Sequence, residues 1–164
     1  MIDGGVQPLS GEALSTLLDD VLTRGVPFRF RARGYSMAPF IRDGDVVTVT
    51  ALAEGRARFG EVVAFVAPGK RLVLHRVTGR RSDRYEIRAD NVDPGAAAKT
   101  AAVDVVPSSS LLGVVRGVER DRRPVRLGLG PERVVIAGLS RLGLLRPLAD
   151  VARAARNVAR PEAR

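Results

Sequence analysis

A serine held between two residues that restrict the backbone is the first candidate for chemistry in this chain. Ser36 lies in the stretch GYSMAP, between Gly34 and Pro39, and such residues fix the shape of a turn. A hydroxyl on a turn can attack a carbonyl when nearby backbone N–H groups hold the oxyanion and a base lies within reach. The chain has one histidine, His75, in the segment LVLHRV. His75 is therefore the candidate base.

Four short motifs in a fixed order accompany these two residues. They are GYSMAP followed by Gly44-Asp45, GEVVAF at 60–65, His75-Arg76-Val77, and Ala89-Asp90-Asn91. In order and spacing, over about residues 28–116, they resemble the type I signal peptidases and their relatives among the signal-peptidase-like and repressor-cleaving serine peptidases of the S24 and S26 families. His75 stands where the common bacterial enzymes have lysine, so the chain is most similar to the archaeal and endoplasmic-reticulum branch, which uses serine, histidine and an aspartate.

The resemblance implies a role for each site residue. Ser36 is the expected nucleophile, His75 the base, and the Ser36 backbone N–H one oxyanion donor. Asp93 is the expected third member, because in the histidine branch the orienting aspartate lies a few residues beyond the Asp-Asn pair; Asp90 is the alternative, and turn capping is the competing role for both. The second oxyanion donor of the family is often a hydroxyl two residues before the serine, where this chain has Gly34. The residues expected to hold the scaffold near the site are Met37, Pro39, Asp45, Arg76 and Asp90.

The elements that position these residues are predicted to be short β-strands. Phe28, Phe30 and Ala32 alternate with arginines, which is the period of a half-buried strand leading to Ser36. Turn signals and the absence of an intervening helical pattern predict a mainly β domain, a signal-peptidase-like coiled sheet or barrel. An alanine-rich loop is expected at 93–102 and a turn at 108–110. The further predicted strands are 46–50, 61–67, 71–78, 84–88 and 111–118.

Helical patterns flank the predicted sheet. Residues 10–24 place leucines and a valine at helical spacing, with Ser10 as N-cap and Gly25 as a stop. Gly130-Pro131 opens a second apolar stretch that Pro147 interrupts. We expect an N-terminal amphipathic helix packed on the domain (1–26), a β catalytic domain (27–126) and a basic amphipathic helical tail (127–164).

The amino-acid composition limits the classes of binding partner and cofactor that we expect. The net charge is +9 with two lysines only, which suits anionic partners but is equally explained by solubility. Aromatic residues make up 4% with no tryptophan, which argues against nucleic-acid binding through stacking. With no cysteine and one histidine, neither a metal nor another cofactor is expected.

The sequences of the two terminal segments predict the cellular location of the protein. The N-terminus lacks the basic and apolar regions of a signal peptide, and no apolar run approaches the roughly 20 residues that span a bilayer. Seven arginines after residue 130, against Glu132, Asp150 and Glu162, give the tail a charge of +4. We therefore expect a cytoplasmic protein, with peripheral contact between its tail and the anionic inner membrane surface.

The function expected from the resemblance is a serine endopeptidase. It would trim a leader or signal segment of a peptide or protein that has small residues one and three positions before the scissile bond. Two alternatives remain open. A repressor-type self-cleaving regulator would need a DNA-binding helix-turn-helix, for which one helix before residue 27 is too little. A catalytically weak peptide-binding module stays open as well, because Gly34 departs from the family pattern and the expected N-terminal membrane anchor is missing.

Overall fold

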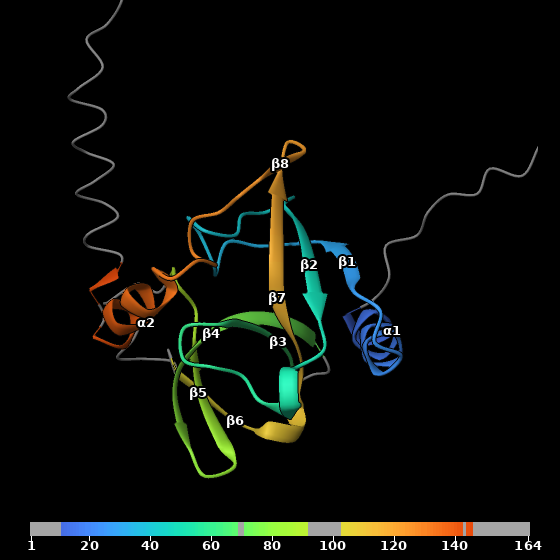
Figure 1. Ribbon diagram of the computed structural model, residues 1–164, viewed down its shortest axis with the longest axis horizontal. Helices are drawn as coiled ribbons and strands as arrows, with labels where there is room; N and C mark the ends of the chain where they lie inside the picture. Colours follow the sequence, from blue (N-terminus) through green and yellow to red (C-terminus); the bar gives the residue numbers. More distant parts are fainter. Residues whose placement is uncertain (1–10, 69–70, 92–102, 143, 146–164) are drawn as a thin grey trace, which may run out of the picture.

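The computed structural model describes residues 11–68, 71–91, 103–142 and 144–145. One antiparallel sheet forms most of this part of the chain and is strongly curled (Figure 1). Its strand order is β1-β2-β7-β3-β4-β5-β6, with β8 beside β7. The prediction of a mainly β, coiled-sheet fold is confirmed. The strands are β1 Phe28–Arg31, β2 Val46–Thr50, β3 Val62–Ala67, β4 Arg71–Arg81, β5 Arg84–Arg88, β6 Val103–Pro107, β7 Leu111–Arg120 and β8 Arg123–Pro124.

The central strands are covered on both faces. In β3, four consecutive residues from Val62 to Phe65 are buried, as expected for a strand with apolar neighbours on both sides. Val62 and Ala64 belong to a core cluster with Leu72 and Leu74 at its margin. Val63 and Phe65 belong to a second cluster on the opposite face, together with β5 side chains. The side chains on the two faces of β3 and β4 thus pack into two separate hydrophobic cores.

Helix α1 (Gly11–Thr23) closes the first core. Its buried residues Leu18 and Leu22 join the cluster of the β2 and β7 side chains, and the helix contacts β4, β7 and β1. The helix lies against the sheet on the opposite side from α2 (Figure 1). The predicted N-terminal amphipathic helix is therefore present, and its last residue, Thr23, lies two residues before the predicted stop at Gly25.

Helix α2 (Arg133–Arg141) lies against β4. Its Ile136, together with Leu145, packs on Phe40 in a third small cluster. The segment that leads into α2 also reaches the sheet, because Leu129 lies at the edge of the first core. This part of the predicted tail is thus packed on the β domain, while residues 146–164 lie outside the described residues.

Most predicted strands have close counterparts, and two strands were not predicted. β2 and β5 have the predicted bounds, and β4 extends three residues further, to Arg81. The unpredicted strands are β6 and β8; the loop expected at 93–102 lies outside the described residues. Among the helices that the structure describes, none has the length and apolar character needed to cross a bilayer.

Candidate active site

The turn that carries Ser36 is fastened from two directions. On one side, the N–H of Gly34 donates to Asp43 Oδ1 over 2.8 Å. On the other side, Asn91 donates twice: its backbone N–H to the Ser36 carbonyl oxygen over 2.8 Å, and its side-chain Nδ2 to the Tyr35 carbonyl oxygen over 3.1 Å. Gly34 has a φ of +91°, a conformation that glycine adopts without strain. These contacts hold Ser36 at the surface, where the residue is exposed.

The buried side chain of Met37 holds the same turn against the first core. Its side chain is buried in the first core with Ile41, and the N–H groups of Phe40 and Ile41 both donate to the Met37 carbonyl oxygen. Pro39 lies half-buried between them. The buried methionine fixes the turn between β1 and β2, so the exposed serine next to it has a defined position.

His75 lies on β4, opposite Val63 of β3. Its ring is 5.6 Å from the Phe65 ring, centroid to centroid, and its side chain is only 15% exposed. Nδ1 is 3.1 Å from Asp104 Oδ2. Because an ionised carboxylate can only accept, the Nδ1 atom carries the proton in this contact, and Nε2 of the neutral ring is left as the basic nitrogen.

The surroundings of His75 favour the neutral ring. Burial lowers the pKa of His75, and although the charge and hydrogen bond of Asp104 act in the opposite direction, the net shift is downward from the ordinary value. At neutral pH the imidazole is therefore unprotonated. This is the state that a general base requires.

Asp104 is the aspartate that the structure brings to His75, and it is not one of the two predicted from the sequence. It lies on β6, paired with Ile87 of β5, and its side chain is 40% exposed. Asp90 instead accepts hydrogen bonds from Arg76, and Asp93 lies outside the described residues. The available signal was a single charged residue in the apolar run AAVDVV, which is compatible with a half-buried strand.

One cleft brings the three candidate residues together. A hollow of about 580 Å³ is lined by Ser36, His75 and Asp104, with the segment 30–34 on one wall and residues 71–74 of β4 on the other. Its lining is mixed, with apolar side chains that include Leu14 of α1, Phe30 and Met37. Among the described residues, no hydrogen bond joins the Ser36 hydroxyl to the His75 ring, and in peptidases without substrate this bond is commonly long.

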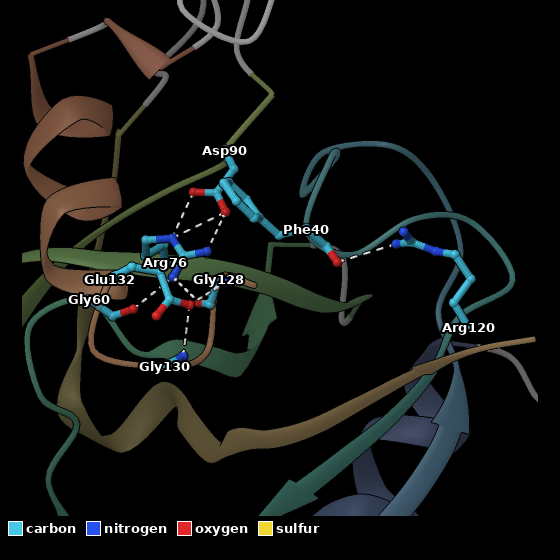
Figure 2. A network of polar contacts seen from close by, with 8 residues as sticks. All are labelled: Phe40, Gly60, Arg76, Asp90, Arg120, Gly128, Gly130 and Glu132. Atoms are coloured by element: carbon cyan, nitrogen blue, oxygen red, sulfur yellow. Dashed lines mark hydrogen bonds and ion pairs between the residues drawn. The ribbon is translucent and has the colours of Figure 1, made fainter. Parts of the chain in front are cut away.

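Arg76 ties both halves of the site to the core (Figure 2). It is fully buried, and its Nε and Nη2 donate to Asp90 over 2.9 and 2.6 Å. Its Nη1 donates to the carbonyl oxygens of Gly60 and Gly128, over 2.8 and 2.9 Å. Burial raises the pKa of Asp90, and the contacts with Arg76 oppose that shift. Since Arg76 follows His75 and Asp90 precedes Asn91, this pair sets the spacing between the histidine strand and the clamp on Ser36.

The loops around Arg76 are fixed in the same network. The guanidinium of Arg76 lies 5.4 Å from the centre of the Phe40 ring, within the range of a cation–π contact. Glu132 Oε1 accepts the N–H groups of Gly128 and Gly130 over 2.7 and 3.0 Å (Figure 2). The glutamate before α2 thus shapes the loop whose carbonyl binds the arginine.

Asp45 holds the far end of the serine turn. Its carboxylate accepts from Arg120 Nε and Nη2 over 2.9 and 2.7 Å, and from the Arg42 N–H over 2.8 Å. Burial raises the pKa of Asp45, but these hydrogen bonds and the charge of Arg120 outweigh it, so the net shift is downward. Arg120 also donates to the Phe40 carbonyl oxygen (Figure 2). Asp45 thus contacts scaffold groups on β7 and in the loop.

A curled β domain that presents an exposed serine and a partly buried histidine in one cleft has the arrangement of a hydrolase of the serine-peptidase type. Residues 11–105, more than half of the chain, match the Peptidase S24-like family. The chain belongs to this family. The match agrees with the wider group inferred from the four motifs; the narrower assignment to the archaeal and endoplasmic-reticulum branch stays a prediction. No curated protein matches the chain.

Proposed function

We propose that the protein is a serine endopeptidase that cleaves an extended peptide segment through Ser36, His75 and Asp104. The observation that carries the proposal is the contact between His75 Nδ1 and Asp104 Oδ2, in the same cleft that Ser36 lines. A base oriented by a carboxylate, near an exposed serine, is the arrangement needed for acyl transfer. Asp104 takes the orienting role that the sequence suggested for Asp93 or Asp90.

The proposed reaction has two halves. His75 Nε2 removes the proton from the Ser36 hydroxyl as Oγ attacks the peptide carbonyl, and Asp104 stabilises the imidazolium that results. The same proton then passes from Nε2 to the leaving amine, and the acyl-enzyme forms. Water, deprotonated by the neutral His75, attacks this ester; the acid product leaves and Ser36 regains its proton.

The oxyanion site of this proposal is incomplete in one respect. The Ser36 N–H is one donor. The Gly34 N–H is engaged by Asp43, so it is not a free second donor, and Gly34 offers no hydroxyl. Loss of one such donor costs about 10²–10³ in rate. We therefore expect slow turnover unless the bound substrate recruits another N–H group.

An exposed strand edge provides a place for the substrate backbone. β4 pairs with β5 only from Arg76 onward, so among the described residues the 71–75 segment has no partner on the edge away from β3. This segment lines the cleft and ends at His75. A peptide can add to such an edge in extended form. The narrower proposal, taken from the resemblance, is a leader-trimming enzyme with small residues one and three positions before the cleaved bond.

Covalent labelling tests the proposal directly. A fluorophosphonate probe should label the full-length protein, with Ser36 as the modified residue in mass spectrometry. Ser36→Ala should abolish labelling, and His75→Ala should slow it strongly. Absence of labelling in a folded protein over a range of pH would contradict an enzymatic role and leave a peptide-binding module on this fold.

The family match favours one second candidate, a self-cleaving peptidase of the repressor type. In this case the same serine and histidine would cut a segment of their own chain. Incubation of the purified protein, followed by intact-mass measurement, should then give two fragments whose masses sum to that of the chain plus one water. The Ser36→Ala variant should stay uncut. Peptide hydrolysis in trans without any self-cleavage would exclude this candidate.

A further inference from the structure

Arginine side chains dominate the charge of the cleft. Arg31, Arg33 and Arg71 line it, whereas Asp104 is the one carboxylate in the described lining. Arg31 and Arg33 come from the wall that leads to Ser36, and Arg71 comes from the opposite wall, at the start of β4. Positive groups on both walls of a cleft attract a negatively charged ligand.

These positive charges have no carboxylate partner in the described part of the chain. Asp104 is engaged with His75. The Nη1 of Arg31 donates to a neutral acceptor, the carbonyl oxygen of Gly44. All three arginines are exposed. By contrast, Arg29 and Arg116, which lie outside the cleft, form ion pairs with Glu119 and Glu61. Within the described residues, the three arginines of the cleft are therefore available to a negatively charged ligand.

The position of Arg71 relates it to a defined part of a bound peptide. Arg71 and His75 are both odd-numbered residues of β4, so their side chains leave the same face of the strand. Four residues separate them, which corresponds to about 13 Å along an extended strand. A peptide lying along the same edge advances at the same rate per residue. Its fourth residue from the cleaved bond would lie beside Arg71.

We propose that the cleft selects peptides that carry an acidic side chain about four residues from the scissile bond, with Arg71 as the principal recognition residue. Arg31 and Arg33 provide positive charge on the facing wall. The proposal rests on the proposed function only in taking the cleft as the peptide site; the acidic preference comes from the arginines. An exposed ion pair of this kind changes affinity by about five-fold, and salt weakens it.

Binding to an inactive full-length protein tests this preference without requiring turnover. We would use the Ser36→Ala variant and fluorescent, end-blocked alanine peptides, with glutamate either four residues before or four residues after a central alanine. Otherwise identical peptides with glutamine serve as the reference. In fluorescence anisotropy at low salt, one glutamate peptide should bind about five-fold more tightly than its glutamine counterpart. The difference should shrink at high salt.

Matched arginine variants decide whether the cleft is responsible. Arg71→Gln should abolish the preference for glutamate, whereas Arg123→Gln, which removes the same charge from exposed β8 outside the cleft lining, should keep it. Equal binding of glutamate and glutamine peptides, no peptide binding at all, or an equal effect of both variants would overturn the proposal. A preference for glutamate that persists in the Arg71→Gln variant would also overturn it. The same holds if Arg71→Gln reduces binding to anionic vesicles but not to peptides. Failure of the peptidase function would appear separately, as absence of Ser36 labelling.

Discussion

Asn91 clamps the backbone of Ser36 through its own N–H, which donates to the Ser36 carbonyl oxygen over 2.8 Å. The residue before it, Asp90, is paired with Arg76, the residue after His75. The serine turn and the histidine strand, far apart in sequence, are thus connected through a single buried ion pair. Disturbing either end of this connection should change the geometry of the site.

The first prediction concerns the clamp. Asn91→Ala removes the Nδ2 hydrogen bond to the Tyr35 carbonyl oxygen but keeps the backbone bond to Ser36. A lost hydrogen bond of this kind costs about 1 kcal/mol, so the melting temperature should fall only slightly. Probe labelling of Ser36 should slow by about ten-fold, because small displacements of a reacting group have large effects on rate. An unchanged labelling rate would show that the backbone bond alone holds the turn.

The second prediction separates orientation from folding. Asp104→Asn removes the charge that faces His75 Nδ1 and should slow labelling by at least about ten-fold at neutral pH. Asp104 acts to raise the pKa of His75, so its loss should also move the pH midpoint of labelling to lower pH. Asp83→Asn, an exposed change in the hairpin turn between β4 and β5, should do neither. A slower rate with an unmoved midpoint would contradict the role given to Asp104.

The third prediction concerns pH in the unmodified protein. Only the neutral imidazole can accept the Ser36 proton, so labelling should rise with pH as His75 loses its proton. Because burial lowers the pKa of His75, the midpoint should lie below the ordinary value of about 6.5. Initial labelling rates over a pH series would measure it. A midpoint well above neutrality would indicate a different base.

The fourth prediction concerns stability. Asp90→Ala leaves the Arg76 guanidinium buried without its carboxylate, and breaking such a pair costs about 3–5 kcal/mol. Urea unfolding of the variant and the parent protein would measure the loss. Asp20→Ala is the control, because Asp20 pairs with Arg24 on the surface of α1, with side chains 57% and 71% exposed. This exposed pair should contribute less than about 1 kcal/mol. Equal losses in the two variants would contradict the role of Arg76 in the core.

Local patterns predicted the elements but not every contact of the site. The alternation from Val46 to Thr50 and the motif around Ser36 depend on neighbouring residues, so the strand β2 and the serine turn could be found from the sequence. The sequence also indicated that Asp45, Arg76 and Asp90 would hold the scaffold, and each of these contacts scaffold groups in the structure.

Asp104 could not be found in the same way. Its contact with His75 requires β6 to pair with β5 and β5 to pair with β4. The two residues are 29 positions apart in the sequence, and the segment between them carries no local signal for that order. The alanine-rich stretch before β6 is predicted to be a loop, so the sequence pattern does not indicate where this strand begins. Long-range pairing of this kind is determined by the packing of the whole sheet.

The last prediction concerns the membrane contact proposed from the basic C-terminal segment. Val135 and Leu142 in and after α2 are 64% and 71% exposed, and Arg141 lies in the last turn of the helix. Apolar groups beside arginines suit an anionic membrane surface, where each arginine contributes about 1 kcal/mol. In flotation assays, the full chain should bind anionic vesicles, should not bind neutral ones, and should be released by salt.

Two substitutions test this contact better than truncation before α2. A chain that ends at Arg126 would lose the Gly128 carbonyl that binds Arg76, and Leu145, which packs on Phe40. Val135→Asp combined with Leu142→Asp keeps these contacts and should abolish flotation while leaving Ser36 labelling unchanged. Equal flotation of the variant and the parent protein would show that the exposed face of α2 does not carry the contact.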